Sequence, residues 1–119
     1  MRLLVVEDDA LLGHDLVEML TESGFNVVGL VQRVKDAMEI ICGPGCDAAV
    51  LDVNLGRETS EAVATELIAR GIPFLALSGY NRLQNPEAFA GAKLLVKPVR
   101  FNVLSAELKQ MADNFAGKT

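Results

Sequence analysis

Short apolar runs alternate with segments of helical periodicity along the chain, and this alternation limits the possible folds more than any other feature. A continuous apolar run of about four to eight residues is typical of a strand buried on both faces. Such runs predict strands at residues 3–6, 26–31, 48–51, 73–77 and 94–96, and helical spacing predicts helices at 11–20, 34–41, 61–70 and 101–115. Strands that alternate with helices imply a parallel sheet covered on both faces. Right-handed crossovers then favour a doubly wound, flavodoxin-like α/β fold with strand order 2-1-3-4-5.

The connection between the fourth and fifth strands departs from this pattern. Residues 79–92 contain one possible helical turn, Pro86 to Ala90, and otherwise have the composition of a loop. We therefore expect the helix at this place to be short or replaced by a loop.

Each predicted helix carries apolar residues at helical spacing, which we expect to face the core. These residues are Leu11, Leu12, Leu16, Met19 and Leu20 in the first helix, Val63, Ala64, Leu67 and Ile68 in the third, and Val103, Leu104, Leu108, Met111 and Phe115 in the last. The last helix, with Phe101, Val103 and Leu104, has the alternative use of a docking or homodimer surface, although amphipathic helices are core elements first.

The length of 119 residues suits a single domain, and half of the residues are hydrophobic, so the chain can form a real core. No apolar run approaches the roughly 20 residues of a membrane span, and the first residues lack a secretory signal. The net charge is −5 and the eleven Lys and Arg residues are scattered, which counts against direct nucleic-acid binding. We expect one cytoplasmic domain over residues 1–119, without membrane contact.

Two cysteines and one histidine are the only candidates for a soft metal site. Cys42 and Cys46 flank a Gly-Pro-Gly turn, where a tight disulfide is one alternative, but we expect reduced thiols in a chain without a secretory signal. A structural zinc site would need two further ligands, and His14 is interpreted as a helix-surface residue.

Polar side chains follow four of the predicted strands at the points where those strands end. Glu7, Asp8 and Asp9 follow the first strand, Asp52 the third, Ser78 the fourth and Lys97 the fifth. The carboxyl ends of parallel strands lie along one edge, and ligands bind there at the switch point between strands one and three. The sequence therefore predicts that these residues converge in one crevice.

Crowded carboxylates repel one another unless a cation neutralises them, and Mg²⁺ suits one or two carboxylates together with phosphate oxygens. Lys97 supplies a positive charge and Ser78 a hydroxyl donor for a phosphoryl group. Asp52 is then a candidate nucleophile that forms an aspartyl phosphate. Each residue also has a structural interpretation when taken alone: Asp9, with its acidic neighbours, as a helix cap, and the others as turn or loop residues.

The motifs VVEDD, LDVNL, LALSG and VKP, in this order and spacing, resemble the receiver domains of two-component response regulators. The resemblance covers essentially the whole chain. It implies that Asp52 is the phosphoacceptor, that Asp8 binds Mg²⁺ directly and Glu7 through water, and that Asn54 offers a backbone carbonyl. It further implies Ser78 as the switch hydroxyl, Lys97 as the conserved-type lysine, and a cis bond to Pro98.

DVNLGRETS and ARGIPFLALSGY also resemble the single-domain receivers of alphaproteobacteria, which have a threonine-glycine-tyrosine motif after the fourth strand. Ser78 replaces the threonine. Leu94 stands where the family usually has a switch aromatic. Whether this chain uses the family's rotation of an aromatic ring toward the switch hydroxyl is therefore left open, and Tyr80 is an alternative residue for signalling.

The resemblance implies a signalling module rather than an enzyme acting on other substrates. A histidine kinase or histidine phosphotransfer protein would donate to Asp52, and phosphorylation would change the Ser78–Lys97 region and the affinity for a downstream protein. Two alternatives are an interaction module that no longer uses phosphate and a small aspartate phosphatase. The phosphatase is disfavoured because Asn54 occupies the place of its second aspartate.

Overall fold

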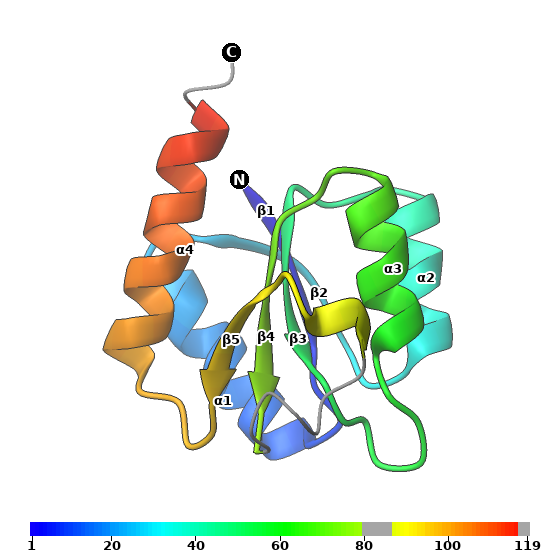
Figure 1. Cartoon of the computed structure of the whole chain (residues 1–119). Coiled ribbons are helices and arrows are strands. Elements are labelled where there is room, and N and C mark those ends of the chain that lie inside the picture. The colour runs from blue at the N-terminus through cyan, green and yellow to red at the C-terminus, as the bar shows by residue number, and fades with distance from the viewer. Residues whose placement is uncertain (80–86, 117–119) are drawn as a thin grey trace.

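The computed structural model describes residues 1–79 and 87–116 as a parallel sheet of five strands covered by helices (Figure 1). The elements are β1 (Arg2–Val6), α1 (Ala10–Glu22), β2 (Asn26–Val31), α2 (Val34–Cys42), β3 (Ala48–Asp52), α3 (Glu61–Ala69), β4 (Phe74–Ser78), the 3₁₀ helix η2 (Glu87–Phe89), β5 (Lys93–Val96) and α4 (Phe101–Ala116). The strand order is β2-β1-β3-β4-β5, which confirms the predicted flavodoxin-like topology. Within the described ranges, no helix combines the length and the apolar character needed to cross a membrane.

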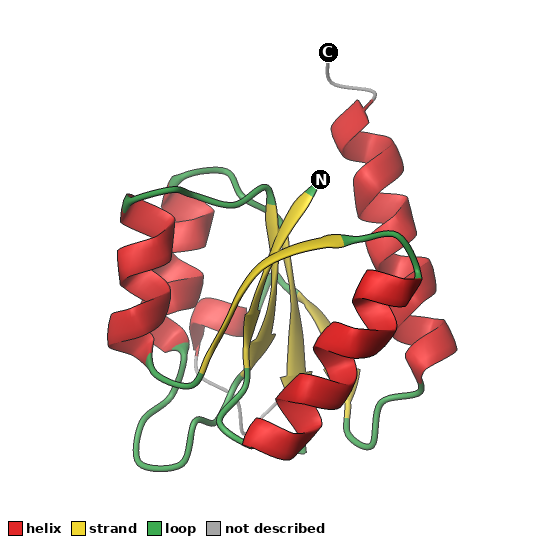
Figure 2. Ribbon diagram, turned by 180° about the vertical axis from the view of Figure 1, so that it is seen from behind, coloured by secondary structure: helices red, strands yellow, loops and turns green. Residues whose placement is uncertain are grey.

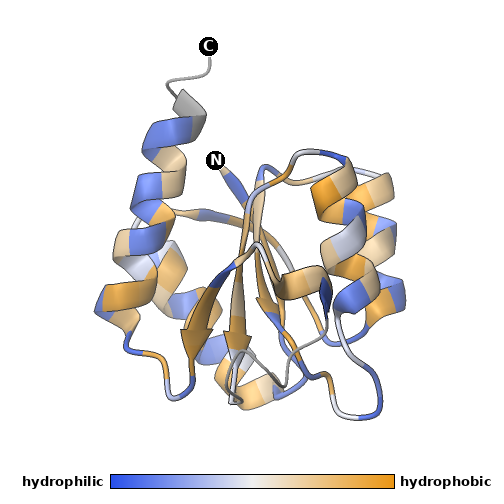
Figure 3. Ribbon diagram, in the orientation of Figure 1, coloured by the Kyte–Doolittle hydropathy of each residue, from blue (hydrophilic) through white to orange (hydrophobic). Residues whose placement is uncertain are grey.

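The helices form one layer on each side of the sheet, with α1 and α4 on one face and α2 and α3 on the other (Figures 1 and 2). Successive residues of a strand point to opposite faces, so β1 serves both layers. Leu3 and Val5 pack in the cluster that includes Leu16 and Leu104, whereas Leu4 packs on the opposite side. The central strands are correspondingly apolar along their length (Figure 3).

Burial explains why the central strands are continuous apolar runs. All residues of β3 and β4 are buried, whereas the edge strand β5 is exposed at Lys93 and Val96. The predicted strands lie within one or two residues of the observed ones. Gly24 and Gly71, with φ of +94° and +69°, follow the ends of α1 and α3, where a left-handed backbone suits glycine.

The described part of the β4–β5 connection contains only the three-residue helix η2, as expected for a short helix at this place. Phe89 of this segment is buried and meets Phe74 edge to face, with ring centroids 6.3 Å apart. The segment therefore contributes to the core on the side of α2 and α3. Residues 80–86, including Tyr80, lie outside the described residues.

The predicted core faces of the helices were too wide. Five of the residues placed there are exposed: Leu11 (75%), Leu12 (45%), Met19 (37%), Ile68 (58%) and Val103 (42%). A helix rotates by about 100° per residue, so Ile68 and Val103 lie well around the axis from the buried Leu67 and Leu104. The sheet covers only a narrower stripe. The side chain of Phe115, also assigned to this face, lies outside the described part of α4.

Both cysteines are free thiols, with Cys42 exposed and Cys46 buried. The tight disulfide between them, considered as an alternative, is therefore not formed in this structure. Cys42 accepts a hydrogen bond from Nη2 of Arg70 at 3.5 Å, and Nη1 of the same guanidinium donates to the carbonyl of Ile41 at 3.4 Å. Arg70 thus links the end of α3 to the end of α2.

Candidate phosphoryl-transfer site

The carboxyl ends of the strands meet at one edge of the sheet, at the bottom of Figure 1. Glu7 and Asp8 follow β1, and Asp52 and Ser78 are the last residues of β3 and β4. Parallel pairing brings these ends together, with Asp52 opposite Leu77 and Ser78 opposite Val96. The convergence inferred from strand order is confirmed.

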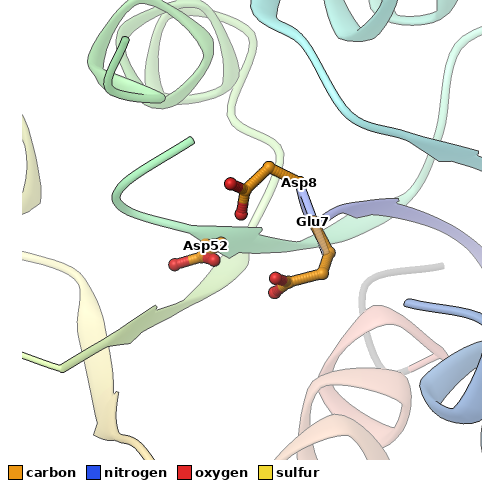
Figure 4. A group of neighbouring side chains, drawn as sticks. All are labelled: Glu7, Asp8 and Asp52. Atoms are coloured by element: carbon orange, nitrogen blue, oxygen red, sulfur yellow. The ribbon is translucent and has the colours of Figure 1, made fainter. Parts of the chain in front are cut away.

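Three carboxylates, those of Glu7, Asp8 and Asp52, form the centre of the site (Figure 4). One oxygen of each lies within 4.8 Å of the others. Glu7 and Asp52 are buried, 2% and 4% exposed, whereas Asp8 is open to solvent. An all-oxygen, negatively charged donor set of this size fits a hard divalent cation. The cluster can therefore hold a metal ion.

Lys97 supplies the positive charge that the two buried carboxylates need. Its Nζ lies 2.7 Å from Oδ2 of Asp52 and 3.4 Å from Oε2 of Glu7. The peptide bond from Lys97 to Pro98 is cis, as predicted. Through these two contacts the Lys97 side chain, from the β5–α4 connection, joins the ends of β1 and β3.

The electrostatics of Glu7 follow from its position. The pKa of its carboxyl is raised from 4.5 to about 7, first by burial and then by the neighbouring Asp52 charge, against the opposing effect of Lys97. Burial lowers the pKa of Lys97, but its hydrogen bond and charge interaction with Asp52, helped by Glu7, outweigh this and raise the pKa overall. A further cation would therefore favour the ionised form of Glu7 beside Asp52.

Asp9 lines the same open pocket as this cluster but is not one of its three carboxylates. Its Oδ1 accepts a hydrogen bond from the backbone N–H of Leu12 at 3.1 Å and caps the start of α1. Its own N–H donates to Oε1 of Glu7 at 3.3 Å. Asp9 therefore acts as the predicted helix cap and helps to orient Glu7.

The loop from β3 to α3 borders the site through Asn54 and Gly56. Its two arms pair through an antiparallel bridge between Asn54 and Thr59 and a bond from the N–H of Leu55 to the carbonyl of Glu58. Oδ1 of Asn54 accepts from the N–H of Gly56 at 3.1 Å. Gly56 has φ of +82°, and an added Cβ would lie 3.4 Å from Oδ2 of Asp8. The loop tip thus lies against the acidic cluster.

Ser78 is buried at 2% exposure, and its backbone carbonyl accepts a hydrogen bond from the N–H of Lys97 at 2.8 Å. The backbone of β4 is therefore joined to the residue that holds Asp52. Leu94, at the place of the family's usual aromatic, is half-buried and packs against the core on the side of α2 and α3.

Two features of the site were missed in the sequence. Ser60 is fully buried, and its hydroxyl donates to the backbone carbonyl of Asp52 at 2.7 Å. A serine directly before a helix is ordinarily an N-cap, so its position in the sequence does not signal this contact. Beside the acidic cluster lies an apolar cleft of about 480 Å³, whose walls include Leu12, Leu16, Met19, Phe101 and Leu104 and which also borders Glu7 and Lys97. Residue spacing within one helix could not show that α1 and α4 leave this gap.

The profile of the response regulator receiver domain matches residues 3–109 of the chain. The chain belongs to this family. The transcriptional regulatory protein PdtaR of Mycobacterium tuberculosis is 30% identical over 118 residues, which cover 96% of this chain and 58% of PdtaR. This chain therefore spans little more than half of the length of that relative.

The fold of this receiver domain is shared with other solved structures. A CheY-like receiver domain protein from Methanospirillum hungatei has a TM-score of 0.87 at 22% identity, covering 99% of this chain and 98% of the other. The response regulator TrrA of Thermotoga maritima, solved in complex with Mg(2+)-BeF, has a TM-score of 0.80 at 22% identity, covering 92% and 97%. The chain is thus a receiver domain of two-component response regulators in both sequence and fold.

Proposed function

We propose that Asp52 accepts a phosphoryl group from a phosphohistidine donor and that the modified domain passes the signal to a protein partner. The observation that carries this proposal is the buried Asp52 carboxylate at the end of β3, held by Lys97 within the cluster of three carboxylates. Asp52 and Lys97 both line an open pocket, and an aspartate that lies there beside a fixed cation is arranged for nucleophilic attack on phosphorus.

The transfer involves one bond formed and one broken. An oxygen of the Asp52 carboxylate attacks the phosphorus, a P–O bond forms, and the P–N bond to the donor imidazole breaks. The imidazole nitrogen keeps the bonding pair and takes up a proton. Lys97, already 2.7 Å from Asp52, is placed to contact a phosphoryl oxygen, and the hydroxyl of Ser78 is assigned to another.

Mg²⁺ is the cation that we assign to the acidic cluster. Asp8 and Asp52 would bind it directly, Glu7 through water and Asn54 through its backbone carbonyl. When bound, Mg²⁺ neutralises carboxylate charge and polarises the phosphoryl oxygens. The complex of TrrA with Mg(2+)-BeF supports the choice of metal by analogy.

A histidine kinase or histidine phosphotransfer protein is the donor that the surface favours. The exposed Leu11 and Leu12 stand at the start of α1, and the apolar cleft opens beside Lys97. An apolar surface directly next to a charged reaction centre suits a protein donor that buries it while presenting a phosphohistidine. We infer that this encounter takes place in the cytoplasm, and that the domain catalyses only its own phosphorylation and dephosphorylation.

The response to phosphorylation is assigned to the Ser78–Lys97 region. The bond from the N–H of Lys97 to the carbonyl of Ser78 couples the ends of β5 and β4, so a displacement of Lys97 toward a phosphoryl group acts on both. Leu94 packs in the core and offers no aromatic ring to rotate. Leu94 is a departure from the family pattern, whereas the short η2 supports placing the chain with the alphaproteobacterial receivers that carry a Thr/Ser-Gly-Tyr motif.

Incubation with acetyl phosphate and Mg²⁺, followed by intact-protein mass spectrometry, tests the function. The wild type should gain one phosphoryl group and Asp52→Asn none. Asp47→Asn is the matched control, because Asp47 pairs with Arg2 at the far edge of the sheet and should leave labelling unchanged. Equal labelling of wild type and Asp52→Asn would refute the assignment, and no labelling of the wild type would favour an interaction module that does not use phosphate.

A further inference from the structure

Ser60 is a buried hydroxyl bonded to the backbone of the proposed phosphoacceptor. Its exposure is 0%, and its Oγ donates to the backbone carbonyl of Asp52 at 2.7 Å. The same Oγ makes a longer hydrogen bond, of 3.4 Å, to the carbonyl of Val53. Its backbone N–H donates to the same Val53 carbonyl at 2.9 Å. Ser60 therefore contacts the end of β3 through both its side chain and its main chain.

The direction of this hydroxyl is unusual for its place in the chain. Ser60 is the residue before α3, where a serine ordinarily accepts a hydrogen bond from an N–H of the first helical turn. The Ser60 side chain makes no such cap bond. The hydroxyl instead points back to β3, so its hydrogen bond stabilises the strand that ends in Asp52 rather than the helix that begins at Glu61.

Ser60 also closes the loop that lies over the acidic cluster. The paired arms of this loop run from Val53 to Ser60, with Asn54 opposite Thr59 and Gly56 at the tip against Asp8. The hydroxyl of Ser60 and its N–H bind the two carbonyls at the base of the loop. A shift at this base would move Asp52 and the loop tip together.

We propose that Ser60 is a positioning residue for phosphoryl transfer: it fixes the backbone of Asp52 so that the carboxylate meets the phosphorus in line. This inference rests on the proposed function of Asp52. In-line displacement depends on orientation, and small misplacements of a reacting group cost rate. Ser60 does not touch the phosphoryl group and acts only through the main chain of Asp52 and Val53.

Ser60→Ala tests the proposal, with Thr65→Ala as the matched control. Thr65 also donates its hydroxyl to a backbone carbonyl, that of Glu61 at 3.0 Å, but on the exposed side of α3. The rate constant for labelling by saturating acetyl phosphate is measured at saturating Mg²⁺, at a temperature where circular dichroism shows every variant to be folded. We expect Ser60→Ala to react about tenfold more slowly, which corresponds to about 1.4 kcal/mol, and Thr65→Ala to react at the wild-type rate.

Two further measurements separate positioning from a general loss of stability. Ser60→Thr, which keeps the hydroxyl, should recover most of the rate. In the Mg²⁺-free protein, the Asp52 carbonyl ¹³C resonance should move in Ser60→Ala, because a hydrogen bond to that carbonyl is lost, and should stay in place in Thr65→Ala. If Ser60→Ala does not fold, Ser60→Cys serves instead, since it has a similar shape and a much weaker donor.

A folded Ser60→Ala or Ser60→Cys protein that is labelled at the wild-type rate would overturn the proposal. So would a slow Ser60→Ala protein whose Asp52 carbonyl resonance is unchanged. Failure of the wild type itself to take up phosphate is a different result, because it refutes the function of Asp52 and not only the part played by Ser60.

Discussion

Nζ of Lys97 lies 2.7 Å from Oδ2 of Asp52, and the same ammonium group reaches Oε2 of Glu7 at 3.4 Å. One cation thus serves two buried carboxylates whose residues lie 45 and 90 positions away in the chain. This relationship connects the stability of the domain to its proposed chemistry, since the charges that suit phosphoryl transfer are costly to bury without a partner.

Removal of this cation should destabilise the Mg²⁺-free protein. We expect Lys97→Met to lower the free energy of unfolding by about 2 kcal/mol at pH 8 in EDTA, because Asp52 and Glu7 would remain buried without a counter-charge. Lys93→Met is the control, since Lys93 forms a more exposed pair with Glu107 and should cost less than about 1 kcal/mol. Urea unfolding followed by circular dichroism measures both. Equal losses in the two variants would contradict this account of Lys97.

The raised pKa of Glu7 predicts a pH dependence of stability. The folded protein holds this proton more tightly than the unfolded chain, with a pKa of about 7 against 4.5. The contribution of Glu7 is therefore fully present below pH 4.5 and lost as the pH rises through about 7. Without Mg²⁺, the free energy of unfolding should fall by roughly 2–3 kcal/mol between about pH 5 and pH 8.

Glu7→Gln identifies the group responsible for that slope. The variant has no proton to lose, so its unfolding free energy should change much less over the same pH range. Glu18→Gln, on α1, is the surface control and should keep the wild-type slope. Saturating Mg²⁺ should reduce the slope of the wild type, because the cation compensates the ionised carboxylates. An unaltered slope in Glu7→Gln would show that another group titrates.

The convergence of the site could be predicted from the sequence, but the loop around it could not. Strand order alone brings Glu7, Asp52 and Lys97 to one edge, because parallel strands share their direction. The hydroxyl of Ser60 turns toward β3 rather than toward its own helix, which only the tertiary arrangement decides. Helical periodicity likewise could not show that Ile68 is exposed, since the width of the buried stripe depends on how the helix lies on the sheet.

Gly56 and Gly71 allow a matched test of the loop tip. Both have positive φ, +82° and +69°, so alanine at either should cost about 1–2 kcal/mol of stability. At Gly56 the new Cβ would lie 3.4 Å from Oδ2 of Asp8, whereas at Gly71 no described atom beyond the two neighbouring residues would lie within 4 Å of the new Cβ. We expect Gly56→Ala alone to weaken Mg²⁺ binding, measured by isothermal titration calorimetry. Equal Mg²⁺ affinities in the two variants would exclude a role of the loop tip in the metal site.

The thiols should differ in reactivity. Cys42 is exposed, whereas Cys46 is buried and its pKa is raised by burial. Brief treatment of the native protein with iodoacetamide should therefore modify Cys42 alone, and treatment in urea should modify both. Peptide mass spectrometry identifies the labelled residue, and Cys42→Ser should remove the rapid reaction. Rapid labelling of Cys46 in the native protein would contradict the described burial.

The most direct test of the central claim is to locate the acyl phosphate within the chain. The protein is incubated with acetyl phosphate and Mg²⁺ and then reduced with borohydride, which converts an aspartyl phosphate to homoserine, and peptides are sequenced by mass spectrometry. The account predicts homoserine at position 52 and at no other aspartate, and none when EDTA replaces Mg²⁺. Homoserine at Asp8 or Asp9, or modification at position 52 that is independent of Mg²⁺, would contradict it.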